Sequence, residues 1–411
     1  MNRNNKPVEL KPLFLERMKK LLPDEKDFEK FLEEIKIQPV NAIRCNKLKI
    51  SSDKLKKTLE EKYNWKISIP WKAHPEIMVI EGKFDNNQVS DNLVNNQTMG
   101  GWRGSGAPVG GADLIELEPG ELGRSLEHLL GYYYIQELSS MLPVIALAPE
   151  KNQRVLDLCA APGSKTTQIS SEMQNTGIII ANEPSLPRLK ILSSNLERCG
   201  ASNVIITKKD GRDLCRRMVE MNFKFSKILI DAPCSGEGTL KSSQKTALMW
   251  NIKTIENLPA IQFSLFRAAF EVLETGGEII YSTCTHAPEE NEGVVDKILR
   301  EFEGRIEISK PNLPKELKTR EGVTSWDNSV AEKKGEEGNN LDDNDLNCSQ
   351  QKGQWGRGKE NSNKKIGGKG EQFSEKSKIK NYDKQVKLCA RVYPQDNKTE
   401  GFFVAKFRRI K

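Results

Sequence analysis

The sequence predicts an α/β fold whose main part is a mostly parallel sheet with an antiparallel last strand. From residue 126 onward, short apolar runs alternate with amphipathic segments, a pattern typical of parallel strands joined by crossover helices. The last two apolar runs, 306–308 and 401–407, are predicted to form a hairpin. A shorter alternation within residues 1–84 predicts a smaller N-terminal α/β domain.

Composition is that of a soluble chain with more than one domain. Its 411 residues suggest two domains plus linkers, and 36% hydrophobic with 29% charged residues suits a soluble protein with some polar length. The net charge of +7 permits an anionic partner without requiring one. No run is long and apolar enough for a membrane helix, and the first residues lack an apolar signal core. We therefore expect no membrane association.

The cysteines argue against a disulfide framework and against a metal site. Eight are scattered through the chain with no CxxC pair, and there are only three histidines. Structural zinc sites need closely spaced cysteine and histidine ligands. We expect no metal, reduced thiols and a cytoplasmic location.

The N-terminal domain, residues 1–84, is predicted to begin with helices. Residues 8–36 place apolar side chains at helical spacing, with Pro23-Asp24 as a break and cap. The segments after them predict strand, helix, strand and strand in turn, at residues 39–48, 53–62, 65–71 and 76–81. Residues 85–125 begin Asn- and Gly-rich and are expected to form a loop and linker.

The main domain is predicted to comprise residues 126–326 and 386–411. It opens with three tyrosines at 132–134, which we interpret as packing between domains rather than as a surface for stacking bases. A helix then leads into the sheet. Residues 327–385 are rich in Asn, Gly, Lys and Glu and poor in aliphatic residues, so we expect a disordered insertion in the final hairpin.

The first strand of this domain runs into a turn of small residues, in the stretch RVLDLCAAPGSK from Arg154 to Lys165. A helix is expected near Ser164, which would be a good N-cap. Only Gly163 is present, so the turn is not G-x-G-x-x-G. It is not a P-loop either, because Ser164 separates Gly163 from Lys165. A strand, a turn and a helix N-terminus are how open α/β sheets bind nucleotides.

Carboxylates follow three successive strands. Glu183 follows the second strand, Asp210 the third and Asp231 the fourth. The carboxyl ends of parallel strands meet at one edge, where Glu183 is placed to hold ribose hydroxyls and Asp210 to accept from an adenine amino group. The turn lacks glycines that would cradle a pyrophosphate. An adenosine ligand is therefore predicted, with S-adenosylmethionine favoured over NAD.

Two cysteines at strand ends indicate the chemistry. Cys234 lies in DAPCSGEG and Cys284 in YSTCT, each after an apolar run. Adjacent parallel strands lie about 4.8 Å apart, so both thiols can face one pocket. Carbon 5 of cytosine is a poor nucleophile until a thiolate adds to carbon 6. A carboxylic acid near ring nitrogen 3 would stabilise the charge that develops, and Asp231 is the candidate.

At these residues the chain resembles the Fmu/Sun (Nop/Sun-type) RNA cytosine-5 methyltransferases. The matching stretches cover most of residues 126–300 and 388–411: YIQELSSMLP, LDLCAAPGSKTTQ, ANE, KKDGRDL, DAPCSGEGTL, YSTCTHAPEENE and RVYPQDNKTEGFFVAKF. The resemblance implies a Rossmann-like methyltransferase sheet. It also implies that Cys284 attacks carbon 6 and that Cys234 assists release of the methylated base. The residues that it implies for contact with S-adenosylmethionine are Cys159, Ala160, Ala161, Pro162, Gly163, Ser164, Lys165, Glu183, Asp210 and Asp231.

The resemblance thus implies an S-adenosylmethionine-dependent methyltransferase that makes 5-methylcytosine in RNA, and we expect it to act as a monomer. We expect the N-terminal domain to grip the RNA and the target base to be flipped into the pocket. A tRNA substrate is favoured over rRNA. Two alternatives stay open: a small-molecule or protein methyltransferase, which gives no reason for two such cysteines, and an RNA-binding assembly factor without catalysis, which predicts loss of these thiols or carboxylates.

Two positions depart from the family's pattern. After DAPCSGEGTL, Lys241 stands where arginine is usual and the following proline is missing. Gln395 follows Pro394 where histidine is common. We expect both positions on RNA-facing loops, where they would affect the choice of substrate rather than the chemistry.

Overall fold

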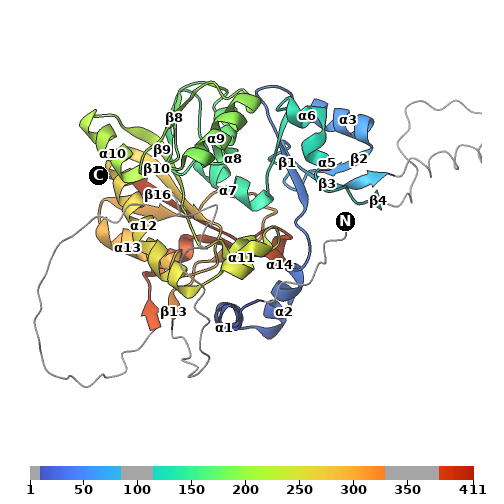
Figure 1. Ribbon diagram of the computed structural model, residues 1–411. Coiled ribbons are helices and arrows are strands. Elements are labelled where there is room, and N and C mark those ends of the chain that lie inside the picture. Colours follow the sequence, from blue (N-terminus) through green and yellow to red (C-terminus); the bar gives the residue numbers. More distant parts are fainter. Residues whose placement is uncertain (1–9, 85–113, 329–378) are drawn as a thin grey trace, which may run out of the picture.

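The computed structural model describes residues 10–84, 114–328 and 379–411, and its centre is a nine-stranded sheet (Figure 1). The strand order is β12-β15-β16-β10-β9-β6-β7-β8, with β11 paired to β16. Strands β6 to β10 pair in parallel, and β16 pairs antiparallel with β10, as the sequence predicts. The strands span β6 Arg154–Asp157, β7 Ile178–Asn182, β8 Val204–Thr207, β9 Phe225–Asp231, β10 Leu273–Thr283, β11 Ile306–Ser309, β12 Arg320–Glu321, β15 Ala390–Val392 and β16 Phe402–Arg409.

The chain reverses its direction of travel across the sheet beside β6. It steps outward from β6 to β7 and β8, and then returns to β9 on the other side of β6. Open α/β sheets bind ligands outside the carboxyl ends of the strands at such a switch point. The turn after β6 and the loops after β9 and β10 therefore lie at the place where a ligand is expected.

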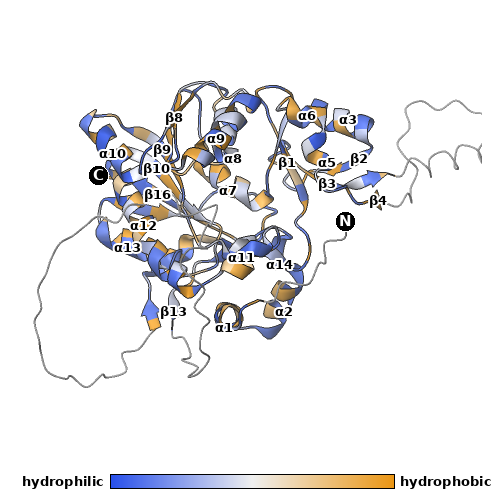
Figure 2. Ribbon diagram, in the orientation of Figure 1, coloured by the Kyte–Doolittle hydropathy of each residue, from blue (hydrophilic) through white to orange (hydrophobic). Residues whose placement is uncertain are grey.

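Helices cover both faces of the large sheet. One face packs against residues of α10, α12 and α13, and the other against residues of α7 and α8. Figure 2 shows hydrophobic residues along the strands and many hydrophilic residues on α10 and α13. The helices span α7 Leu138–Leu147, α8 Ser164–Glu172, α9 Leu186–Cys199, α10 Gly211–Glu220, α11 Gln244–Met249, α12 Ile252–Glu271, α13 Glu292–Glu301 and α14 Pro394–Asn397, with 3-10 turns η1 Glu237–Thr239 and η2 Lys384–Leu388. Within the described ranges, no helix is both long and apolar enough to cross a membrane.

A smaller antiparallel sheet has the order β2-β3-β1-β5, with β4 paired to β3. Two of its strands lie outside the predicted N-terminal segment 1–84: β4 falls in the predicted linker, and β5 falls in the predicted main domain. A three-residue strand carries too little apolar pattern to show which sheet it joins. The elements are β1 Asn41–Cys45, α3 Ser52–Tyr63, β2 Trp65–Ser68, β3 Ile77–Phe84, β4 Leu114–Ile115, α5 Glu121–Arg124, α6 Leu126–Leu129 and β5 Tyr133–Ile135.

Arg44 of β1 connects the small sheet to the large one. Its buried guanidinium donates to Gln136 Oε1 at 2.6 Å, to the Ser164 carbonyl at 2.7 Å and to Thr167 Oγ1 at 2.9 Å. The Tyr134 ring lies under both Arg44 and Arg198, with guanidinium carbons 5.6 and 5.4 Å from its centroid. Tyr134 thus packs between the small sheet and α9 of the large-sheet domain, as the packing interpretation expects, whereas Tyr133 is buried in the core of the small sheet.

The first two helices, α1 Pro12–Leu21 and α2 Glu25–Glu34, pack on the large-sheet domain rather than on the small sheet. Phe14, Met18 and Phe31 share one apolar cluster with Trp250 and Tyr393. Figure 1 shows α1 and α2 beside α14, away from β2 and β3. The grouping of these helices with the small α/β domain was therefore wrong in space.

The predicted insertion, residues 327–385, is paired at both ends. Strand β13, Ser325–Asp327, pairs antiparallel with β14, Ile379–Asn381. Tyr382 beyond it is buried. Residues 329–378, together with residues 85–113 of the predicted loop, lie outside the described residues.

Candidate active site at the carboxyl edge of the large sheet

The turn after β6 is formed by Cys159, Ala160, Ala161, Pro162 and Gly163, and α8 begins at Ser164. Gly163, not Ser164, is the N-cap, with a φ of +106° that a side chain would strain. A Cβ at Gly163 would also lie 3.0 Å from Leu192 Cδ1. The prediction that Ser164 caps the helix was wrong, because the left-handed turn requires glycine at the preceding position.

The side chain of Lys165, in the first turn of α8, points toward the candidate catalytic residue Asp231. Its Nζ lies 2.8 Å from Asp231 Oδ2 and donates to Ser140 Oγ at 3.0 Å. Ser282, the neighbour of Asp231 in the strand pairing, donates to Asp231 Oδ1 at 2.8 Å. Lys165 was predicted only as a cofactor contact, and Ser140 and Ser282 were not predicted. The carboxylate of Asp231 is thereby held at both oxygens.

Glu183 follows β7 and is nearly fully buried, with 1% of its surface exposed. Its Oε1 accepts from the Ser185 amide at 2.8 Å, and its Oε2 lies 3.2 Å from Arg188 Nη1. Arg188 also donates to the Ala161 carbonyl at 2.8 Å. Burial raises the pKa of Glu183 above its ordinary value, while Arg188 counteracts this. Arg188, which the sequence reasoning missed, joins the strand-end carboxylate to the turn.

Asp210 lies three residues after the end of β8 and caps α10, accepting from the Arg212 amide at 2.9 Å. The Arg212 guanidinium also binds both carboxylate oxygens, at 2.9 and 2.6 Å. Burial opposes ionisation of Asp210, but its hydrogen bonds with Arg212 lower the pKa below the ordinary value. A carboxylate offers about four lone-pair sites, so Asp210 can accept a further hydrogen bond beside Arg212.

The two predicted cysteines meet. Cys234 Sγ and Cys284 Sγ lie 3.2 Å apart, because β9 and β10 are adjacent parallel strands whose ends carry the two loops. Cys234 is 5% exposed, whereas Cys284 is only partly buried. The hydrogen bond to Cys284, followed by burial, raises the pKa of Cys234 well above its ordinary value. Cys234 is therefore held as a thiol in contact with the sulfur of Cys284.

A third thiol, Cys159, lies in the turn after β6. Burial raises its pKa well above the ordinary value, and the nearby carboxylates of Asp157, Asp231 and Glu183 raise it further. Because the thiolate is the reactive form, Cys159 is a poor nucleophile in this position. Of these three cysteines, the accessible Cys284 is the one suited to attack.

Asp157, at the end of β6, was missed from the sequence. It is buried, and its Oδ2 accepts from Thr166 Oγ1 at 2.7 Å. Among the described residues, its Oδ1 has no hydrogen-bond partner. Burial raises the pKa of Asp157 to about 7. Its position in the sequence could have identified it, because Asp157 ends the strand in LDLC just before the small-residue turn.

The two departures from the family's pattern both contact α2, and Lys241 is buried whereas Gln395 is partly buried. The Lys241 side chain is 1% exposed, and its Nζ lies 2.5 Å from Glu34 Oε1 on α2. Gln395 donates to Asp27 Oδ1 of the same helix at 3.2 Å. The expectation of an RNA-facing loop is wrong for the buried Lys241, because α2 packs over it, and for Gln395 it stays a prediction.

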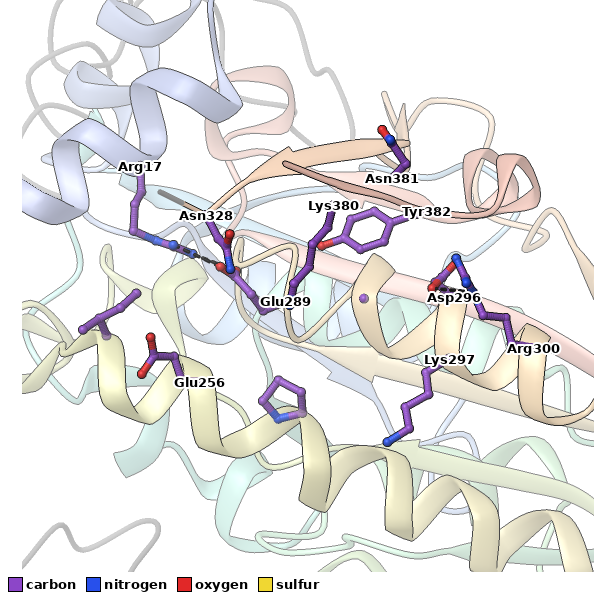
Figure 3. A pocket seen from close by; sticks show the side chains of 13 residues that line it. Arg17, Glu256, Glu289, Asp296, Lys297, Arg300, Asn328, Lys380, Asn381 and Tyr382 are labelled. Atoms are coloured by element: carbon purple, nitrogen blue, oxygen red, sulfur yellow. Dashed lines mark hydrogen bonds and ion pairs between the residues drawn. The ribbon is translucent and has the colours of Figure 1, made fainter. Parts of the chain in front are cut away.

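A cavity of about 620 Å³ lies on another side of the domain, between α1, α12, α13 and β14 (Figure 3). Arg17 and Glu289 form a two-point ion pair in its wall, with nitrogen–oxygen distances of 3.1 and 2.8 Å. None of the predicted site residues lines this cavity. The candidate active site is therefore defined by the strand-end loops and not by this cavity.

The comparisons with known proteins agree on the family. Residues 144–338 match the family model described as 16S rRNA methyltransferase RsmB/F. Ribosomal RNA small subunit methyltransferase F of Erwinia tasmaniensis is 38% identical over 300 residues, which are 72% of this chain and 55% of that protein. The protein of that name from Escherichia coli strain K12 is 40% identical over 285 residues, 68% of this chain and 51% of that protein. The chain thus spans about half the length of these relatives.

Solved structures agree on the fold. A methyltransferase homologue from Pyrococcus horikoshii has a TM-score of 0.66 at 25% identity, with 98% of this chain and 96% of that chain covered. NSun6 from Pyrococcus horikoshii, crystallised with SFG, has a TM-score of 0.65 at 22% identity, with 99% and 100% covered. The sheet, its strand order and the matched segment lead to one conclusion: the large-sheet domain of this chain belongs to the RsmB/F (Fmu/Sun) family of methyltransferases.

Proposed function

We propose that this protein transfers a methyl group from S-adenosylmethionine to carbon 5 of a cytosine in RNA. The observation that carries the proposal is the contact of 3.2 Å between the sulfurs of Cys234 and Cys284, at the edge where Asp231 is held. A methyltransferase for small molecules or proteins has no use for two thiols in this arrangement. Pyrimidine C5 chemistry uses both.

The residues present fit the cofactor. Small side chains and Gly163 form the turn, Glu183 and Asp210 follow the next two strands, and Asp157 Oδ1 is a buried acceptor without a described partner. S-adenosylmethionine, when bound here, supplies the methyl group. Glu183 would hold the ribose and Asp210 the adenine. The structural relative crystallised with SFG, an analogue of S-adenosylmethionine, supports the choice of cofactor.

Cys284 is proposed as the nucleophile. Its sulfur adds to carbon 6 of cytosine and forms a C6–S bond, and the electron pair of the C5=C6 bond moves to make carbon 5 nucleophilic. Cys284 is more exposed than Cys234, so the base can reach it.

Asp231 and Lys165 are proposed to act together on the pyrimidine. Asp231, acting as a carboxylic acid, would donate its proton to ring nitrogen 3 and so stabilise the charge that develops there, and the carboxylate left behind would pair with Lys165. Lys165, 2.8 Å from Asp231 Oδ2 and only 9% exposed at its side chain, fixes the carboxylate. We therefore assign Lys165 to the catalytic centre as well as to the turn.

Cys234 is proposed to assist release. After methylation a base such as water takes the proton from carbon 5, the C5=C6 bond re-forms and the C6–S bond breaks. Cys234, as a thiol 3.2 Å away, donates to the sulfur of Cys284 as it leaves. Removal of this donor leaves the covalent adduct intact.

An rRNA substrate is supported by the curated relatives, which are named for the small ribosomal subunit. The tRNA that the sequence reasoning favoured has no such support. We propose a cytosine of small-subunit rRNA as the target, bound with help from the N-terminal elements, and a monomeric protein in the cytoplasm.

The test uses purified protein, radiolabelled S-adenosylmethionine and small-subunit rRNA, with tRNA as the competing substrate. Cys284→Ala should abolish methylation and form no adduct. Cys234→Ala should accumulate an RNA–protein adduct that survives denaturant. An adduct from Cys284→Ala but not from Cys234→Ala would reverse the two roles, and label at a position other than carbon 5 would overturn the reaction. Methylation of tRNA alone would overturn the choice of substrate.

A further inference from the structure

Two buried side chains bind the backbone on either side of Cys234. Glu290 Oε2 accepts from the Ser235 amide at 3.0 Å, directly after the cysteine. Gln262 Nε2 donates to the Pro233 carbonyl at 2.9 Å, directly before it. The same nitrogen donates to Glu290 Oε2 at 2.8 Å. Glu290 and Gln262 therefore form one bracket around the Cys234 peptide.

Glu290 also belongs to the loop that carries the other cysteine. It follows Cys284 by six residues, and its carbonyl accepts from Tyr281 Oη at 2.6 Å. Its surface is 0% exposed, as is that of Gln262. One buried carboxyl group thus sets the position of the Cys234 turn relative to the Cys284 loop.

The neighbouring Glu289 offers a contrast. Its carboxylate binds Arg17, as Figure 3 shows, and accepts from Trp326 Nε1 at 2.9 Å. It therefore points to the cavity side, whereas Glu290 points to the Cys234 turn. Two adjacent glutamates in one loop contact different parts of the domain.

We propose that Glu290, together with Gln262, is a positioning residue for the release step, holding the thiol of Cys234 against the sulfur of Cys284. The inference rests on the proposed function. Addition to carbon 6 and methyl transfer need the sulfur of Cys284, which the bracket does not touch. Release needs the short contact between the sulfurs, and a shift of about 1 Å at the turn would break it.

Glutamine is a conservative replacement for this glutamate. Burial raises the pKa of Glu290 to about 8, so the side chain is mostly neutral at pH 7. A neutral amide of the same length keeps an oxygen that can accept from the Ser235 amide. Alanine keeps none, so the Ser235 amide loses its acceptor, and Gln262 Nε2 keeps only the Pro233 carbonyl.

The experiment compares Glu290→Ala, Glu290→Gln and Gln262→Leu with the two cysteine variants. In Glu290→Ala and Gln262→Leu, a single turnover of methyl transfer should stay within about threefold of wild type, while multiple turnover falls about tenfold or more and denaturant-resistant adduct accumulates. Glu290→Gln should restore release. Glu289→Gln is the matched control, because it disturbs the same loop but should accumulate no adduct. Melting temperatures show which variants are folded.

The outcomes separate this inference from the proposed function. If Cys234→Ala accumulates adduct but folded Glu290→Ala and Gln262→Leu release product at the wild-type rate, the bracket has no role in release. If the rates of Glu290→Ala and Gln262→Leu fall equally in single and in multiple turnover, the two residues have a structural role only. If Cys284→Ala stays active, the proposed function itself is wrong. Should Glu290→Ala not fold, Gln262→Leu alone decides the matter.

Discussion

The buried carboxyl of Glu290 gives a prediction in which the sign and the size both follow from the structure. Burial raises its pKa to about 8 from an ordinary 4.5. Between pH 4.5 and about 8 the folded protein keeps the proton of Glu290, whereas the unfolded chain releases it. Stability from this group is therefore fully present below about pH 4.5 and is lost as the pH rises to about 8.

The size follows from the difference between the two values. At about 1.36 kcal/mol per pH unit, a difference between 4.5 and about 8 amounts to at most about 5 kcal/mol. Folded domains have total stabilities of about 5–15 kcal/mol, so the loss is measurable. In Glu290→Gln the side chain at this position does not titrate. The difference in stability between variant and wild type should therefore move in favour of the variant as the pH rises.

The assay is urea unfolding of both proteins between pH 5.5 and 9, followed by tryptophan fluorescence. Other buried groups with shifted pKa values, including Asp157, Glu400 and His286, are present in both proteins and cancel in the difference. The unfolding midpoint of the wild type should fall more steeply with pH than that of Glu290→Gln. Two curves that stay parallel from pH 5.5 to 9 would refute the reasoning.

Three further predictions concern the catalytic edge. Lys165→Met removes the contact of 2.8 Å with Asp231 and should lower the single-turnover rate about 100-fold. Binding of S-adenosylhomocysteine, measured by calorimetry, should change less than threefold. A large loss of binding with an unchanged rate would show that Lys165 contacts only the cofactor. Arg44→Met removes four hydrogen bonds, three of them buried, that join β1 to Gln136 and to α8. It should cost about 3 kcal/mol in urea unfolding and weaken cofactor binding, and an unchanged midpoint would contradict this. Hydrogen peroxide should oxidise Cys234 and Cys284, whose sulfurs lie 3.2 Å apart, to a disulfide with an S–S bond of about 2.05 Å. Two titratable thiols and the activity should be lost together, and dithiothreitol should restore both. Inactivation without loss of thiols would contradict this prediction.

Much of the fold could be predicted because the pattern of the large sheet is local. Apolar runs and the helices between them show the parallel strands within a few residues. Strand β10 begins at Leu273, but its continuous apolar run begins only at Ile279, because residues 274–278 are polar or glycine and hide the first half of the strand. The pairing of β5 with β1 could not be predicted, since Ile43 and Ile135 meet across a long stretch of sequence.

The candidate site likewise has a part that the sequence predicts and a part that it does not. The meeting of Cys234 and Cys284 follows from two strand ends and a crossover, which sequence reasoning can reach. The partner of Lys165 does not follow, because the direction of its side chain depends on where α8 begins, and that start is set by the left-handed Gly163. Arg188 and Glu290 act through single side-chain contacts that no periodic pattern records.

The two substitutions that set this chain apart from its family's pattern are best explained by α2. Lys241 binds Glu34, and Gln395 binds Asp27. Asp27 is also held by Arg320, with a nitrogen–oxygen contact of 2.7 Å. A buried ammonium needs a carboxylate beside it, and α2 supplies one, so Lys241 is tolerated without contact to RNA. Because α2 joins the loops after β9 and β15, the N-terminal helices are structural parts of the methyltransferase domain.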